Sequence, residues 1–342
     1  MATPTSKQDD KRTNVMDLKG RVFSWFMTGC LAVVSASVSD ALSALEELKR
    51  FTFSEYHMGI DARLVLFAPD QAAAEKAGKA AFDRIAQLDS IMSDYRKDSE
   101  LNRLCAKAGQ GPVKVSPDLF RVLSKAREIS AKSDGAFDVS VGPLITIWRA
   151  ARKSGVLPDK AVIEQARKLV GWQKIKLDSR NQTVELTTSD MKLDLGGIAK
   201  GYAGDEAIKV LRKFGIKSAM VEMGGDLVFS NRPPHSDGWV VRIPNAGEDH
   251  GPVDLKFMDC AVSTSGDTEQ FAVIGGVQYS HVVDPRTGWA LTNRVQATVV
   301  SKSGLDTDPI STAITVLDDQ HRAAFLARFR GLKTYIRTLK RL

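Results

Sequence analysis

A carboxylate, two glycines and a lysine lie together in the segment Asp194-Leu-Gly-Gly-Ile-Ala-Lys200-Gly-Tyr202. The pattern predicts a strand over residues 191–195 that ends in the carboxylate, and then a helix over residues 199–214 with the lysine in its first turn. The first turn of a helix offers unpaired N–H groups and the positive end of the helix dipole, so it suits a phosphate. The glycine spacings of the P-loop and of the dinucleotide fingerprint are absent. A plain tight turn explains the same residues, and both interpretations stay open at this point.

A second segment, Asp306-Thr-Asp308-Pro-Ile-Ser-Thr312-Ala, combines carboxylates with hydroxyls where a helix is predicted over residues 309–317. Asp308 and Thr312 are four residues apart and share a helical face, and Ser311 lies beside them. Carboxylate and hydroxyl oxygens suit a hard cation such as Mg²⁺, which keeps few protein ligands and shares a substrate phosphate. The alternative is that Asp308 is an ordinary N-cap before a proline at the first helical position.

The segment Tyr279-Ser-His281-Val-Val-Asp284-Pro-Arg-Thr-Gly288 places a histidine in an apolar strand predicted over residues 278–283, before a turn. The sequence has five histidines, and this one alone lies among polar and turn-forming neighbours. His281 is therefore a candidate general base, with a satisfied core histidine as the alternative. Two further segments, Gly224-Gly225-Asp226 and Ser263-Thr-Ser-Gly-Asp267, could bind an anion or form turns.

Taken together, these segments resemble the FAD:protein FMN transferase family, also called the ApbE family, from Met58 to about Leu317. Eight blocks occur in the order of the family, and such an order is hard to obtain by chance. Ile60 stands where many relatives have Thr, Thr268-Glu269 replaces the usual aromatic residue, and Ser311 replaces an acid found in some members. The blocks are residues 57–59, 93–95 with 98–102, 135–144 with Trp148, 194–202, 224–226, 264–267, 281–288 and 308–313.

The resemblance implies a Mg²⁺-dependent enzyme that attaches FMN from FAD to a Ser or Thr hydroxyl of an acceptor protein through a phosphoester bond and releases AMP. His281 would take the hydroxyl proton, and Asp308 would be catalytic through the metal. An FAD pyrophosphatase, with water as the nucleophile, and a non-catalytic periplasmic flavin-binding protein are the alternatives. The residues that would contact FAD are Met58, Tyr95, Ala136, Phe137, Asp138, Asp194, Lys200 and His281. The Mg²⁺ ligands would be Gly197 (through its backbone oxygen), Asp308 and Thr312, with Ser311 at a position that is an additional ligand in some relatives.

From residue 50 onward the sequence has no linker, repeat or low-complexity segment, and it predicts an α+β, ApbE-like fold with mixed sheets and packed helices. Helices gather early, at residues 70–92, 117–134 and 158–171, and strands dominate later. We expect a flavin transferase domain over residues 50–320, followed by a C-terminal helix end and strand over residues 321–342. The other predicted strands are residues 60–67, 175–177, 183–186, 218–223, 239–243, 270–274, 295–300 and 333–338, and a last helix covers residues 321–329.

Residues 1–39 have the pattern of an N-terminal extension and a secretory signal. Lys19 and Arg21 precede a short apolar run over residues 22–34, and small residues follow through Ser39. The run is short of the roughly 20 residues of a membrane span. We expect cleavage after Ala36 and a location in the periplasm or on the outer face of the cytoplasmic membrane. A lipoprotein processed at Cys30 and a buried N-terminal helix are the alternatives.

Composition excludes several classes of protein. A content of 43% hydrophobic and 26% charged residues is that of an ordinary globular chain. The formal net charge is +7, but no aromatic-interleaved basic strand or recognition-helix pattern accompanies it, so no nucleic-acid partner is expected. The three cysteines form neither a CxxC pair nor a Cys/His cluster, which argues against a structural zinc site and a disulfide framework.

Overall fold

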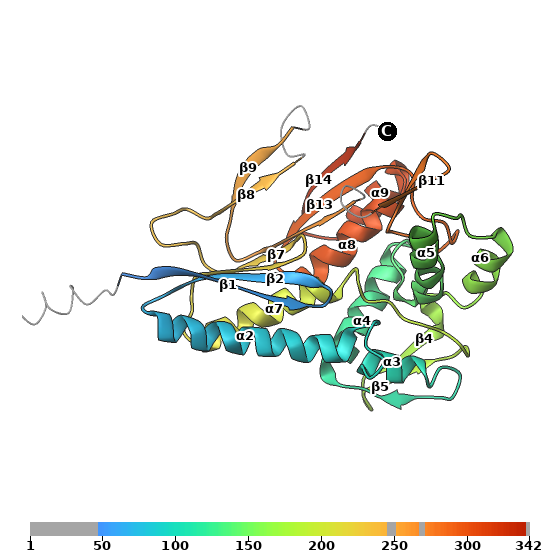
Figure 1. Ribbon diagram of the computed structural model, residues 1–342, viewed down its shortest axis with the longest axis horizontal. Coiled ribbons are helices and arrows are strands. Elements are labelled where there is room, and N and C mark those ends of the chain that lie inside the picture. Colours follow the sequence, from blue (N-terminus) through green and yellow to red (C-terminus); the bar gives the residue numbers. More distant parts are fainter. Residues whose placement is uncertain (1–46, 245–250, 267–270, 340–342) are drawn as a thin grey trace, which may run out of the picture. The chain divides into compact units, whose positions relative to one another are not determined.

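The computed structural model describes residues 47–244, 251–266 and 271–339. The chain divides into one unit over Met1–Glu47 and a second over Leu48–Leu342, and the fold is that of the second unit (Figure 1). The predicted signal segment, with Cys30 and Ala36, lies outside the described residues, as do Thr268 and Glu269. Within the described part of the chain, no helix is long and apolar enough to cross a membrane.

A seven-stranded sheet in the order β1-β2-β6-β7-β10-β13-β14 forms the centre of this unit (Figure 1). All the strand pairs of this sheet are antiparallel. The predicted α+β class is therefore confirmed, but the central sheet is purely antiparallel and not mixed as predicted. Two tight turns show the reason: residues 58–59 join β1 to β2 and residues 224–225 join β6 to β7, all with positive φ, and so short a connection links only antiparallel strands. The strands are β1 (Lys49–His57), β2 (Ile60–Ala68), β6 (Ala219–Met223), β7 (Asp226–Phe229), β10 (Ala261–Ser265), β13 (Val295–Ser301) and β14 (Lys333–Thr338).

The two faces of the central sheet are covered differently. Side chains alternate along a strand, and Leu64 and Leu66 of β2 belong to the large core shared with the helices, whereas Val65 between them packs with the β8–β9 hairpin (Figure 1). The helix over residues 71–92 begins after the N-cap Asp70 and buries one apolar face, which includes Ala77, Ile85 and Leu88. The elements that cover the sheet are α2 (Gln71–Met92), α7 (Ala199–Lys213), α8 (Gly304–Val316), α9 (Asp319–Leu326), β8 (Trp239–Ile243) and β9 (Val253–Phe257).

A second group of elements carries the remaining candidate residues. Ser116 caps the helix over residues 117–132, which ends two residues before the predicted end at residue 134. Trp148 packs its ring 5.3 Å from that of Tyr279, and its Nε1 donates to the carbonyl oxygen of Gly288 at 2.9 Å, so a helix, a two-stranded sheet and the turn after it form one small core. The elements are α3 (Glu100–Cys105), α4 (Pro117–Lys132), α5 (Gly142–Ser154), α6 (Lys160–Arg167), the sheet of β3 (Val113–Lys114), β5 (Thr183–Leu186) and β4 (Ile175–Asp178), and the sheet of β11 (Phe271–Ile274) and β12 (Val277–Ser280).

Several predictions from the sequence are corrected by the structure. Residues 191–195 carry no strand, because the Asp194 N–H donates to the carbonyl oxygen of Val139 (2.8 Å) in the 3-10 turn η1 (Val139–Val141). Helix α8 begins at Gly304 and contains Pro309, so Asp308 is not its N-cap. Strand β14 has the predicted bounds and pairs with β13, so residues 333–338 complete the central sheet. The elements α3, α5, β1, β3, β7, β9 and β10 were not predicted.

Candidate active site

Helices α7 and α8 cross in direct backbone contact. A Cβ added at Gly201 would lie 2.1 Å from the carbonyl oxygen of Gly304, and one added at Gly304 would lie 2.3 Å from that of Gly201. The Asp205 carboxylate of α7 accepts hydrogen bonds from the N–H groups of Gly304 (2.8 Å) and of the next residue (3.0 Å). These N–H groups have no partner within α8 itself. Two glycines and one carboxylate thus fix the register in which Lys200 meets Asp308.

Lys200 lies between two buried carboxylates. Its Nζ is 3.0 Å from Asp226 Oδ2 and 3.6 Å from Asp308 Oδ2, and it donates to the carbonyl oxygen of Gly196 at 2.9 Å. The Gly201 N–H donates to the same Asp308 oxygen at 3.2 Å. Burial raises the pKa of Asp308, the charge of Asp226 raises it further, and the Lys200 ammonium opposes both. Burial by itself would lower the pKa of Lys200, but the two carboxylates outweigh it and raise this pKa. Lys200, in the first turn of α7, therefore stays protonated and positively charged near neutral pH.

Neutral oxygens gather one turn further along α8. Ser265 Oγ of β10 is 2.7 Å from Ser311 Oγ and 3.2 Å from Thr312 Oγ1, and Ser311 Oγ donates to the carbonyl oxygen of Asp308 at 2.8 Å. A Cβ added at Gly197 would lie 3.2 Å from Thr312 Oγ1, so the Gly197 backbone lies against this hydroxyl. The structure thus brings together the four residues predicted to hold Mg²⁺. Among the described residues no three His, Cys, Asp or Glu side chains are grouped as metal ligands, so an ion here would depend on one carboxylate and neutral oxygens.

Asp194, just before the glycine turn, is held from two sides. Its Oδ1 accepts from the N–H of Gly196 (2.8 Å), and its Oδ2 accepts from Nη2 of Arg149 in α5 (2.9 Å). Arg149 also pairs with Asp94, and its guanidinium lies 4.4 Å from the centre of the Tyr95 ring. The structure therefore joins two predicted flavin-contact residues, Tyr95 and Asp194, through an arginine that the sequence did not indicate.

Ala136, Phe137 and Asp138 are all buried. Asp138 Oδ1 accepts from the N–H (2.8 Å) and hydroxyl (2.7 Å) of Ser140, and its Oδ2 accepts from the N–H of Trp172 (2.7 Å) in the 3-10 turn η2 (Trp172–Lys174). Burial raises the pKa of Asp138, and these hydrogen bonds oppose the rise. Asp138 thus ties two turns together. Phe137, next to it, lies within 3.3 Å of the Cβ position of Gly197.

Met58 lies in the β1–β2 turn with φ of 52° and packs, half-buried, against the large core. The β6–β7 turn lies beside it, since a Cβ added at Gly224 would be 3.0 Å from Cγ2 of Ile60. The departure at Ile60 from the Thr of many relatives therefore places an apolar side chain between two turns of the sheet.

His281 is half-buried and directly follows the last residue of β12. Strand β12 belongs to a different sheet from β7 and β10, which carry Asp226 and Ser265. The predicted turn after it is closed by Asp284, whose carboxylate pairs with Arg286 at 2.9 Å. The bond from Trp148 to Gly288 anchors this turn to α5. The small core of α5, α6, β11 and β12 thus sets the place of the histidine.

A sequence model described as the ApbE family matches residues 58–336. The chain belongs to the ApbE family. A Treponema pallidum protein named FAD:protein FMN transferase is 29% identical over 303 residues, which are 83% of each chain. A Vibrio cholerae protein of the same name is 30% identical over 255 residues, 73% of this chain and 76% of the relative. The structure of the Pseudomonas stutzeri flavinyl transferase ApbE in its apo form matches with a TM-score of 0.75 and 28% identity, over 86% of this chain and 93% of that one. The resemblance stated from the sequence is confirmed.

Several residues of this ApbE-family site were not singled out from the sequence. Asp226 stands out in the sequence only as part of a glycine turn, although a carboxylate beside two glycines repeats the pattern around Asp194. Ser265 belongs to a hydroxyl-rich segment with the same ambiguity. Arg149 is separated by 55 residues from Asp94 and by 45 from Asp194, so no local spacing could have indicated it.

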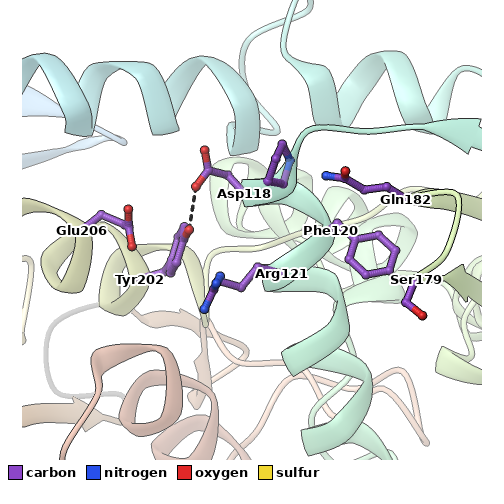
Figure 2. A pocket seen from close by; sticks show the side chains of 8 residues that line it. Asp118, Phe120, Arg121, Ser179, Gln182, Tyr202 and Glu206 are labelled. Atoms are coloured by element: carbon purple, nitrogen blue, oxygen red, sulfur yellow. Dashed lines mark hydrogen bonds between the residues drawn. The ribbon is translucent and has the colours of Figure 1, made fainter. Parts of the chain in front are cut away.

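Tyr202, at the end of the glycine motif, points toward Asp118 of α4 (Figure 2). Its hydroxyl donates to Asp118 Oδ1 at 2.6 Å, and Arg84 pairs with both Asp118 (2.5 Å) and Glu206 (2.8 Å). A cavity of about 510 Å³ opens here, and the residues predicted for FAD and Mg²⁺ are not among those that line it. Tyr202 therefore has a structural contact with α4. The lining residues are Pro117, Asp118, Phe120, Arg121, Ser179, Gln182, Tyr202 and Glu206.

Proposed function

We propose that this chain is a Mg²⁺-dependent FAD:protein FMN transferase that attaches FMN to a Ser or Thr hydroxyl of an acceptor protein and releases AMP. The observation that carries the proposal is the α7–α8 crossing, where Lys200 and the Asp308–Thr312 face meet the Gly196-Gly197 turn. A cation, a carboxylate and neutral oxygens side by side suit a pyrophosphate with a divalent ion. The curated relatives bear the name of this activity, which supports the same conclusion.

The donor set fits Mg²⁺, which prefers hard oxygen ligands and completes its shell with water and substrate phosphate. Asp308, Thr312 Oγ1 and the Gly197 carbonyl oxygen would hold the ion, with Ser311 as an additional ligand. The backbone of residue 197 can lie this close because glycine has no Cβ. A Cβ at this position would lie only 3.2 Å from Thr312 Oγ1 and 3.3 Å from the Phe137 ring. When bound, the ion would neutralise charge on the pyrophosphate.

The other steps fall to side chains of this chain. Lys200 would bind the pyrophosphate oxygens, because Asp226 and Asp308 keep it charged. The acceptor hydroxyl oxygen forms a bond to the phosphorus of the FMN half, and the bond from this phosphorus to the AMP oxygen breaks. The hydroxyl proton passes to His281, which makes a weak nucleophile reactive. FMN is thereby esterified to the acceptor, and AMP leaves with the bridging oxygen.

The test is an incubation of the purified chain with FAD, Mg²⁺ and a candidate acceptor flavoprotein. In-gel flavin fluorescence measures labelled acceptor, and chromatography measures AMP and free FMN. We expect a fluorescent acceptor band with an equal amount of AMP, and no band for an acceptor whose target hydroxyl residue is replaced by Ala. Free FMN and AMP without labelling would identify a pyrophosphatase instead. FAD binding without any product would identify a binding protein.

We also propose that the enzyme works on the outer side of the cytoplasmic membrane. The support is the signal pattern of residues 1–39, with Lys19 and Arg21 before a short apolar run. A periplasmic transferase would meet acceptor proteins exported to the same compartment.

A further inference from the structure

Arg149, in the middle of α5, holds two carboxylates at once. Its Nη1 pairs with Asp94, and its Nη2 donates to Asp194 Oδ2 at 2.9 Å. A planar guanidinium that bonds two carboxylates is fixed in orientation as well as in position. A lysine in its place would bring a single ammonium on a flexible stem and could not reproduce this geometry.

On one side, Arg149 anchors the turn that carries a proposed metal ligand. The other oxygen of Asp194 accepts from the N–H of Gly196 (2.8 Å), directly before Gly197. Burial raises the pKa of Asp194 and the charge of Asp94 raises it further, whereas Arg149 opposes both. Without the arginine, two carboxylates of like charge would repel each other, and the Gly196-Gly197 turn would lose a fixed support.

On the other side, Arg149 supports an aromatic ring. The guanidinium lies 4.4 Å from the centre of the Tyr95 ring, within the range of a cation–π contact. Tyr95 is nevertheless 73% exposed, so most of its ring surface is open to solvent. An aromatic ring backed by a cation is a stacking platform for a planar ring of a nucleotide.

Arg152, one turn along the same helix, shows that a positive charge alone does not give this arrangement. Its Nη1 is the one buried side-chain nitrogen or oxygen without a hydrogen-bond partner among the residues described. Burial lowers the pKa of Arg152, and the charge of Arg149 lowers it further. Arg149 therefore pairs with both Asp94 and Asp194. Arg152 carries the same charge nearby but does not link these two carboxylates.

We propose that Arg149 is a positioning residue that couples the stacking of a planar ring of FAD on Tyr95 to the placement of the Gly196-Gly197 turn for Mg²⁺. The inference rests on the proposed function. It predicts that FAD affinity and the Mg²⁺ requirement change together when Arg149 is replaced, although α5 contributes no metal ligand.

The experiment compares wild type with Arg149→Met, Arg149→Lys and the matched control Arg152→Met. FAD binding is measured by flavin fluorescence over a range of Mg²⁺ concentrations, apart from any turnover, and thermal unfolding checks each fold. For Arg149→Met we expect the Kd for FAD to rise on the order of 10-fold and the Mg²⁺ concentration for half-maximal effect to rise with it. Arg149→Lys should recover less than half of this loss, and it keeps the test valid if the Met variant does not fold. Arg152→Met should bind FAD within about twofold of wild type.

Three results of these FAD titrations would overturn the inference, and a fourth comes from competition. Arg149→Met could bind FAD as Arg152→Met does, Arg149→Lys could behave as wild type, or FAD affinity could fall at an unchanged Mg²⁺ requirement. Competition with AMP and with FMN then identifies the ring, because the mononucleotide whose affinity falls in Arg149→Met is the one that stacks on Tyr95. Loss for neither would also refute the platform. If wild type itself binds no FAD, the proposed function fails, and that outcome is distinct from all of these.

Discussion

The substitution Gly201→Ala places a methyl group where α7 meets α8. Its Cβ would lie 2.1 Å from the carbonyl oxygen of Gly304, 2.6 Å from the carbonyl carbon, and 3.0 Å from Cβ of Asp308. Non-bonded carbon atoms are at their optimal separation at about 3.5–4.0 Å, so the helices would have to move apart by roughly 1 Å or more. Two of the three obstructing atoms are backbone atoms, which no change of rotamer can move.

The expected loss of stability follows from two opposing effects. Overpacking costs typically about 1–3 kcal/mol, and a backbone clash belongs at the upper end. Alanine is better than glycine within a helix by about 1 kcal/mol, so we expect the free energy of unfolding to fall by about 2 kcal/mol. Gly204→Ala is a matched control on the same helix with the same gain in propensity. Its Cβ would meet a side-chain methyl of Val228 at 2.7 Å, which can yield more easily than backbone.

Urea unfolding of the two variants measures the difference, because a shift in midpoint at unchanged m-value reports stability alone. FMN transfer is then measured at a temperature where both are folded. We expect Gly201→Ala to lose about 10²-fold in transfer, since a displacement near 1 Å separates Lys200 from Asp308. If Gly201→Ala is as stable and as active as Gly204→Ala, the helices do not depend on this contact, and the account of how the site is assembled is wrong.

Four further outcomes are expected. Asp308→Ala should lower FMN transfer on the order of 10³-fold or more while FAD binding weakens less, and near-normal turnover without excess Mg²⁺ would rule out a role as metal ligand. His281→Ala should lower turnover by about 10²–10⁴-fold. In wild type the rate should fall on acidification, because a protonated imidazole accepts no proton. Protonation of Asp308, whose pKa burial raises, would add an acid limb in both proteins, so the test is the part of the pH profile that His281→Ala removes; a variant profile of unchanged shape would place the base elsewhere. Burial would raise the pKa of Asp118, but the contacts with Arg84 and Tyr202 outweigh burial and lower this pKa. The stabilising effect of the Asp118 carboxylate is therefore present above the unfolded-state pKa of about 3.9, and it is lost as the pH falls through the folded-state pKa. Asp118→Asn should therefore lower the urea midpoint at pH 7 and approach wild type below about pH 4, whereas a constant difference would contradict the linkage. N-terminal sequencing from the native host should find a mature chain beginning near Ser37, and an intact N-terminus in the cytoplasmic fraction would refute export.

Elements with strong local signals could be predicted from the sequence. Helix α2 has its cap at Asp70 and a regular apolar face, and α4 has Ser116 followed by a proline. Residues 191–195 show the limit of periodicity: Met191, Leu193 and Leu195 alternate and are buried as in a strand, yet the backbone packs against a 3-10 turn. Alternation indicates which side chains are buried, and a ladder partner far away in the sequence decides whether a strand forms.

The site shows the same division between local and distant information. The spacing of Asp308 and Thr312 indicated a shared helical face, and that face exists in α8. The start of α8 was predicted too late, because its first turn is stabilised by the Asp205 carboxylate of α7 and not by a cap within the segment. The pairing of Lys200 with Asp226 likewise depends on how α7 crosses the sheet, which no spacing along the chain reveals.

The position of Lys200 explains how the site tolerates two buried carboxylates and still suits a metal. Asp226 and Asp308 without a cation would be strongly unfavourable in so buried a place. Lys200 is nearer to Asp226 (3.0 Å) than to Asp308 (3.6 Å), and the contacts that Lys200 and the Gly201 N–H make with Asp308 fall on Oδ2. Asp226 therefore keeps the lysine in place, and a hard cation on the Thr312 side of Asp308 would not need to displace it. Under the proposed function, one arrangement would serve both charge groups of a metal-bound pyrophosphate: Lys200 would bind its oxygens, and the α8 face would hold its ion.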